Sequence, residues 1–134
     1  MKRALVLALL LAAPAAAQDI EPGDAMEGAE IFATYCVACH GLEGRGDGRM
    51  TPILTVLPPD LTQIQAGNGG VFPVAATIFQ IDGRDPLLAH GADMPLFGMF
   101  FQGFDIGMKT ETGQPIMTSK PIADVVAYLK EIQE

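Results

Sequence analysis

Apolar side chains recur every three or four residues near the front of the chain. This stripe consists of Ala25, Ala29, Phe32 and Cys36. Such spacing returns each side chain to the same face of a helix. Asp24 stands where an N-cap is expected, and Glu27 three residues later predicts a capping box. The pattern therefore predicts a helix that begins after Asp24.

A second amphipathic stretch lies at the end of the chain. Ser119-Lys120-Pro121 is a favourable helix start, because proline is tolerated in the first turn. The apolar stripe that follows consists of Ile122, Val125, Val126, Leu129 and Ile132. We expect this stripe to pack at an angle on the Phe32 face of the first helix, with Tyr128 at the crossing.

Shorter elements are predicted between these two helices. An N-capping aspartate and a terminal glycine bound a short helix over residues 60–67. A proline at the start and Gly83 after the end bound another helix over residues 73–82. Its buried side would consist of Val74, Ile78 and Ile81. The chain is therefore predicted to be all-α, with about four to five helices and a small β-hairpin near residues 104–118.

Residues 41–49 interrupt the helical pattern with four glycines in nine positions. A segment of this composition forms a loop. Phosphate-binding glycine-rich loops follow a strand and end in Gly-Lys-Ser/Thr, and this segment has neither feature. We therefore expect a structural turn.

The first 17 residues have the pattern of a secretory signal peptide. Lys2-Arg3 precede an apolar run over residues 4–13, and small residues follow up to Ala17, after which we expect cleavage. The apolar run is shorter than the roughly 20 residues of a membrane span, so no stable membrane insertion is expected after cleavage. An uncleaved N-terminal anchor is the alternative. With cleavage after Ala17, the mature domain would comprise residues 18–134.

Length and charge narrow the class of partner. The chain has 134 residues, long enough for one core, with 16 acidic and 8 basic side chains. Loss of Lys2 and Arg3 with the leader leaves 6 basic side chains and a net charge of −10. Phosphate binding needs a basic face, so nucleic acid is not an expected partner. A protein with a basic docking surface is the expected complement.

The run Cys36-Val37-Ala38-Cys39-His40 has a specific chemistry. In a Cys-x-x-Cys-His run the thiols can add across the two vinyl groups of a haem, and the histidine can bind its iron. If the run forms one helical turn, Cys36 and Cys39 lie on one face and can reach neighbouring vinyl groups. We therefore expect one covalently bound haem c per chain, held by Cys36, Cys39 and His40.

Other uses of the two cysteines are open. A thioredoxin-like pair would follow a strand in a βαβ unit, and a zinc site would need a second pair of ligands. The chain has two cysteines, and its histidines are His40 and His90, so neither use is favoured. A disulfide between Cys36 and Cys39 would close a very small, strained loop. A haem-free thiol or metal-binding protein is the corresponding alternative function.

Three features together resemble class I, mitochondrial-type cytochromes c. They are the run Gly28-x-x-x-Phe32-x-x-x-Cys36-x-x-Cys39-His40, the segment Met94-Pro95-Leu96-Phe97-Gly98, and Ala127-Tyr128-Leu129 near the end. The resemblance implies the cytochrome c fold around one covalently bound haem. It also implies that Gly28 allows close approach of the C-terminal helix.

The resemblance implies the remaining site residues. Met94 would be the second axial ligand of the iron, opposite His40. In the family, the carbonyl of a proline about a dozen residues after the histidine accepts a hydrogen bond from its other ring nitrogen, and Pro52 lies at that offset. The alternatives are Pro58 and Pro59 as acceptors, and His90, Met99 or an open position at the iron.

These expectations describe an electron carrier rather than an enzyme. With His40 and Met94 on the iron, no coordination position is open to a substrate, and Met/His ligation raises the reduction potential above that of bis-His ligation. Haem attachment in the family takes place outside the bacterial cytoplasm, so the leader indicates the periplasm. The partners would be redox proteins.

Two further functions remain open. The chain could be the haem subunit of a larger dehydrogenase or reductase, bound through residues 99–118. It could also be a haem sensor or peroxidase with an open or displaceable sixth ligand. Otherwise, this segment, which is strongly apolar over residues 100–104, is expected to wall the haem pocket.

Overall fold

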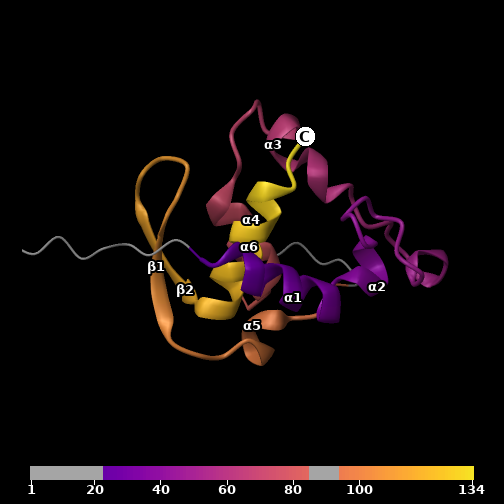
Figure 1. Cartoon of the computed structure of the whole chain (residues 1–134), viewed down its shortest axis with the longest axis horizontal. Coiled ribbons are helices and arrows are strands. Elements are labelled where there is room, and N and C mark those ends of the chain that lie inside the picture. Colours follow the sequence, from indigo (N-terminus) through magenta and orange to yellow (C-terminus); the bar gives the residue numbers. More distant parts are fainter. Residues whose placement is uncertain (1–22, 85–93) are drawn as a thin grey trace, which may run out of the picture.

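The computed structural model describes residues 23–84 and 94–134, which form a mostly helical domain with one small antiparallel sheet (Figure 1). Within these residues there are six α-helices, two 3₁₀ helices and two strands. In chain order they are α1 (Ala25–Tyr35), α2 (Val37–His40), η1 (Thr51–Ile53), η2 (Leu61–Gln63), α3 (Ile64–Gly67), α4 (Val74–Asp82), α5 (Phe97–Phe100), β1 (Asp105–Lys109), β2 (Pro115–Ser119) and α6 (Lys120–Glu131).

Helices α1 and α6 cross at the centre of the fold (Figure 1). Gly28 allows this contact, because a Cβ at that position would overlap the carbonyl oxygen of Asp124 in α6. One turn further along α1, the ring of Phe32 lies 5.2 Å from the ring of Tyr128. The predicted crossing of the first and last helices is confirmed, with Tyr128 at the contact.

The start of α1 is capped by Asp24, as predicted. Its carboxylate accepts hydrogen bonds from the backbone N–H groups of Met26 and Glu27, at 2.9 and 3.2 Å. The second half of the predicted capping box is wrong. The N–H of Asp24 donates to the buried carboxylate of Asp124 at 2.8 Å rather than to Glu27. Asp124 also accepts from Lys120 at 2.7 Å, so its buried charge is compensated.

The core is built from α1, α4, α5, α6 and the hairpin. Its buried apolar residues are Phe32, Phe72, Val74, Ile78, Ile81, Phe97, Phe101, Met108, Ile122, Ala123, Val125, Val126 and Leu129. Helix α4 ends as predicted at Gly83, whose φ of 68° is the left-handed conformation that glycine adopts without strain. Its predicted buried side is also confirmed.

The predicted hairpin is confirmed as β1 paired antiparallel with β2, with Met108 opposite Ile116. It lies at the opposite end of the domain from α2 (Figure 1). The described residues contain more helices than the four to five predicted. The additional helices include α2 and α5, which are single turns of four residues each. The predicted leader, residues 1–17, lies outside the described residues. No helix within residues 23–84 and 94–134 has the length and hydropathy needed to cross a membrane.

Substitution of Gly28 by alanine should destabilise the fold. The added methyl group would overlap the backbone of α6, and overpacking of this kind costs about 1–3 kcal/mol. Gly67→Ala is the matched control, because a Cβ at the end of α3 would meet no atom within 4 Å. Urea unfolding should show a lower midpoint for Gly28→Ala and no loss for Gly67→Ala. Equal midpoints would contradict the proposed role of this contact.

Candidate functional site

The Cys-x-x-Cys-His run forms a single helical turn directly after α1. The backbone N–H groups of Cys39 and His40 both donate to the carbonyl of Cys36, at 3.1 and 2.9 Å. The turn is α2, with Cys36 at its N-cap position. Both cysteines are free thiols. The one-turn geometry expected for this run is therefore present.

The glycine-rich loop caps the C-terminal end of this turn. Gly46, Gly48 and Met50 donate backbone N–H groups to the carbonyls of His40, Cys39 and Ala38, at 2.8, 3.1 and 2.8 Å. The last carbonyls of a helix have no partner within the helix, so the loop satisfies them. A Cβ on Gly48 would lie 2.5 Å from the carbonyl oxygens of Ala38 and Cys39, which explains the need for glycine. The loop thus has a structural role, as predicted.

A cavity of about 440 Å³ lies beside this turn. Its wall comprises Phe32, Tyr35, Cys36, Cys39, His40, Leu54, Val56, Leu57, Pro58, Pro59, Leu61, Ile64, Pro73, Ala76, Thr77, Gln80, Ile81, Met94, Pro95, Phe97, Phe101, Val125 and Leu129. Most of these side chains are apolar. Pockets of about 300–1,000 Å³ with apolar walls and a few polar groups are typical of cofactor sites.

His40 is suited to bind a metal ion at neutral pH. Burial lowers its pKa, because the protein interior disfavours the charged imidazolium. The imidazole is therefore neutral and has a free lone pair. Its Nδ1 is buried and has no hydrogen-bond partner among the described residues. A buried nitrogen of this kind is expected to gain an acceptor when the ring is fixed by a ligand.

The Cys36 thiol is not suited to thiol–disulfide exchange. Burial, and secondly the charge of Cys39, raise the pKa of Cys36 to about 12. A redox-active cysteine requires a lowered pKa, because the thiolate is the nucleophile. This observation disfavours the thioredoxin-like use of the pair. In the part of the chain that the structure describes, no three His, Cys, Asp or Glu side chains are placed to hold a metal ion by themselves.

Some of the remaining candidate residues line the cavity and others do not. Met94 lies on its wall, together with Cys36, Cys39 and His40. Pro52 is exposed in η1 and is not part of the wall, whereas Pro58 and Pro59 are. Met99 is 67% exposed on α5. His90 lies outside the described residues.

The segment from residue 99 to 118 was expected to wall the pocket, and only part of it does so. Phe101 lines the cavity, but Phe100 and Phe104 are exposed and the hairpin does not contribute to the wall. Sequence reasoning missed the wall residues Val56, Leu57 and Gln80. Val56 and Leu57 carried one usable signal, since they are apolar residues in a loop with no helical or strand period.

The residues present fit a covalently attached haem. Two cysteines on one helical turn, a neutral histidine beside them and a methionine thioether all border one apolar cavity. Thioether and imidazole groups are common axial ligands of haem iron. An apolar wall suits the large apolar surface of a porphyrin.

Comparison with known proteins agrees with this geometry. None of the curated proteins and none of the solved structures compared with the chain matches it. A family model described as Cytochrome c matches residues 25–133, most of the chain. The protein therefore belongs to the cytochrome c family, whose members bind haem c covalently and transfer electrons.

Proposed function

We propose that the protein is a periplasmic cytochrome c that carries single electrons on one haem. Cys36 and Cys39 would form the thioether bonds, and His40 and Met94 would hold the iron. The observation that carries the proposal is that all four residues border the same apolar cavity. The predicted signal peptide over residues 1–17 supports export to the periplasm.

When bound, the haem supplies one-electron Fe(III)/Fe(II) chemistry. The chain contributes to this chemistry in three ways. His40, neutral because of burial, donates its lone pair. Met94 provides a soft thioether, which favours the reduced iron and raises the reduction potential. The apolar wall excludes water and disfavours the extra charge of the oxidised state, which raises the potential further.

We further propose that Pro58 or Pro59, rather than Pro52, provides the carbonyl acceptor for Nδ1 of His40. Both prolines line the cavity, and Pro52 does not. Their carbonyl oxygens lie against the glycine-rich loop. A Cβ on Gly46 would overlap the oxygen of Pro58 and lie 3.1 Å from that of Pro59. Gly46 itself donates to the carbonyl of His40, so this segment is close to the histidine.

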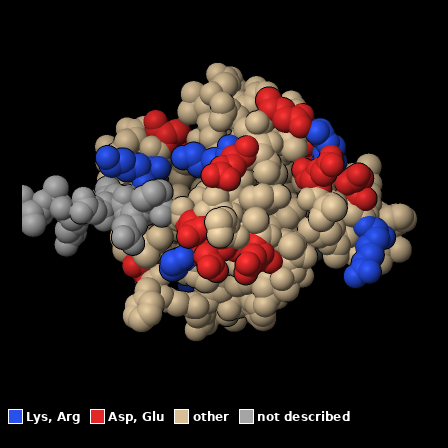
Figure 2. All heavy atoms as spheres, in the orientation of Figure 1, with Lys and Arg blue, Asp and Glu red and all other residues tan. Residues whose placement is uncertain are grey.

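The expected partner is a redox protein with a basic docking surface. Acidic side chains are spread over the face shown in Figure 2, in agreement with the strongly acidic composition. Tyr35, Val56 and Leu57 line the cavity and are also exposed, so they form an apolar rim at its mouth. An apolar rim, in a chain of strongly acidic composition, favours brief, salt-dependent docking.

Exposed apolar side chains on α5 and the hairpin support one alternative function. Met99, Phe100, Phe104 and Met117 are all more than 60% exposed. Such side chains are typical of surfaces that other proteins cover. The alternative is a haem subunit of a larger dehydrogenase or reductase.

Size-exclusion chromatography of a native periplasmic extract distinguishes the carrier from the subunit. A free carrier should elute at the size of a monomer of this small chain, followed by its haem absorbance. Elution of all the haem absorbance in a much larger complex, stable in high salt, would contradict the carrier.

Substitution of Met94 tests the axial ligand. The reduced and oxidised wild-type protein should show the spectrum of a six-coordinate haem c, including the weak near-infrared sulfur-to-iron band in the oxidised form. Met94→Ala should lose this band and bind carbon monoxide rapidly when reduced, because a coordination position is opened. Met99→Ala, in which an exposed methionine is removed, should retain the band.

The same spectra can contradict the proposal. A wild-type protein with haem but without the band would have His90 or an open position as the sixth site. The sensor or peroxidase function would then be favoured. A mass equal to that of the bare chain from Gln18 to Glu134 would show that no haem is attached.

Removal of the haem should unfold the protein. An empty cavity costs about 24 cal/mol per Å³, so about 440 Å³ corresponds to at most about 11 kcal/mol, since the mouth admits water. The whole stability of a domain is roughly 5–15 kcal/mol. Chain produced without haem attachment should therefore show weak helical circular dichroism and no cooperative urea transition, unlike the haem-loaded protein. A cooperative transition of similar free energy in both forms would contradict this prediction.

A further inference from the structure

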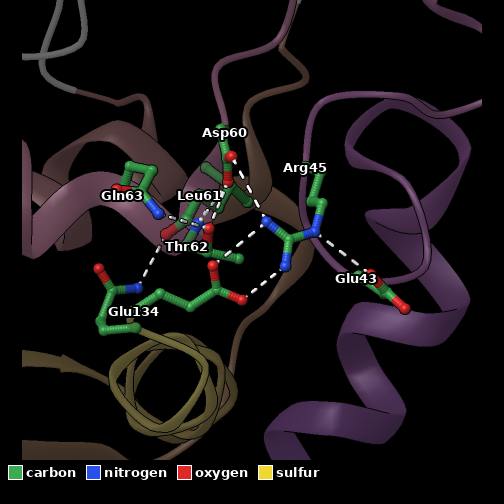
Figure 3. Close-up of polar contacts among 8 residues, drawn as sticks. Glu43, Arg45, Asp60, Leu61, Thr62, Gln63 and Glu134 are labelled. Carbon is green, nitrogen blue, oxygen red and sulfur yellow. Dashed lines mark hydrogen bonds and ion pairs between the residues drawn. The ribbon is translucent and has the colours of Figure 1, made fainter.

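A cluster of charged side chains joins the glycine-rich loop to two distant parts of the chain (Figure 3). Arg45 donates to both carboxylate oxygens of Glu134, at 2.5 and 3.3 Å, and to Glu43 at 3.2 Å. Its guanidinium also lies 3.9 Å from Asp60. One side chain therefore connects the loop, the start of η2 and the C-terminal residue. We call these four residues the Arg45 clamp.

The partners of Arg45 are themselves held in place. The carboxylate of Asp60 accepts from the backbone N–H and the hydroxyl of Thr62, at 2.9 and 2.6 Å. The backbone N–H of Glu134 donates to the carbonyl of Thr62 at 3.0 Å, and the N–H of Leu61 donates to that of Gly44 at 2.7 Å. These bonds fix the carboxylate of Asp60 and the backbone of Glu134, so that the planar guanidinium can bridge the two residues, which a flexible ammonium cannot do.

The clamp lies on the outer side of the loop that supports His40. On its inner side, the loop donates backbone N–H groups to the carbonyls of Ala38, Cys39 and His40. Gly46, next to Arg45, lies against the carbonyls of Pro58 and Pro59, and Asp60 is the residue that follows them. Arg45 therefore joins the loop that donates to the carbonyl of His40 to the segment that carries Pro58 and Pro59.

We propose that Arg45 is a positioning residue for the haem ligand His40. Through Asp60 and Glu134 it keeps the Pro58–Pro59 carbonyls and the loop in register with the histidine, and so keeps the Nδ1 acceptor in place. A hydrogen-bond acceptor at Nδ1 strengthens the imidazole as a donor and stabilises the oxidised iron. This inference rests on the proposed function, because it requires a haem bound to His40.

The charge-neutral substitutions Arg45→Lys and Arg49→Lys provide the first test, on haem-loaded protein. Arg49 is exposed in the same loop and forms no ion pair with any described residue, so it is the matched control. Neither substitution changes the net charge. Arg45→Lys loses the bridging geometry and should raise the midpoint reduction potential, because a less well supported His40 is a weaker donor. Arg49→Lys should leave the potential at the wild-type value.

The pair Arg45→Gln and Arg49→Gln provides a stronger perturbation. Loss of a positive charge stabilises the oxidised iron and lowers the potential in both variants. Arg45→Gln should nevertheless have the higher potential of the two, because its loss of positioning acts in the opposite direction. The double variant Arg45→Gln/Glu134→Gln should change the reduction potential by less than the sum of the changes in the two single variants. Both substitutions remove the same interaction.

The outcomes separate this inference from the proposed function. Equal potentials in each matched pair would overturn it, even if urea unfolding showed that Arg45→Gln is less stable, because the clamp would then be structural only. A wild-type protein without attached haem would instead overturn the proposed function. A raised potential in Arg45→Lys, with Arg49→Lys unchanged, supports the positioning role.

Discussion

The close crossing of α1 over α6 is the contact on which the rest of the structure depends. The absence of a Cβ at Gly28 lets the backbone of α1 approach the carbonyl of Asp124. At this separation the ring of Phe32 lies between Tyr128 and His40, at centroid distances of 5.2 and 6.5 Å. The helix that leads into the Cys-x-x-Cys-His turn is thereby fixed to the helix whose Val125 and Leu129 form part of the cavity wall. A wider crossing would separate the turn from its pocket.

Much of the fold could be predicted because its elements have local boundary signals. Asp24, Asp60 and Gly83 each act on backbone groups within four residues, through caps at the first two and a left-handed turn at the third. The predictions were wrong or incomplete where a distant group competes. The N–H of Asp24 is bound by Asp124, which lies 100 residues away, so the capping box does not close. Helix α5 has no side-chain cap and only four residues, and no periodic pattern can identify it.

The candidate site likewise has one part that local spacing predicts and another part that only the folded chain brings together. Its three motif residues are consecutive or three apart, so one helical turn is enough to bring them together. The cavity wall comes from several helices and from the loop that carries Val56 and Leu57, and no spacing in the sequence relates these positions. Pro52 illustrates the limit of counting along the chain. The glycine-rich loop occupies most of the residues between His40 and Pro52, which lies within η1, and Pro58 and Pro59 on the cavity wall lie six and seven residues later.

Stability and redox chemistry draw on the same apolar side chains in a protein of this family. Phe32, Val125 and Leu129 belong to the core and also face the cavity, so part of their surface has no protein neighbour. A covalent haem, as in other members of the family, would provide that missing contact, and the same contact would keep water from the iron and disfavour its oxidised state. Larger side chains at these positions would fill the cavity and improve the packing of the chain alone, but they would exclude the cofactor. The cavity is therefore retained at a cost in the stability of the haem-free chain, and attachment through Cys36 and Cys39, as proposed, would make the compensating contact permanent.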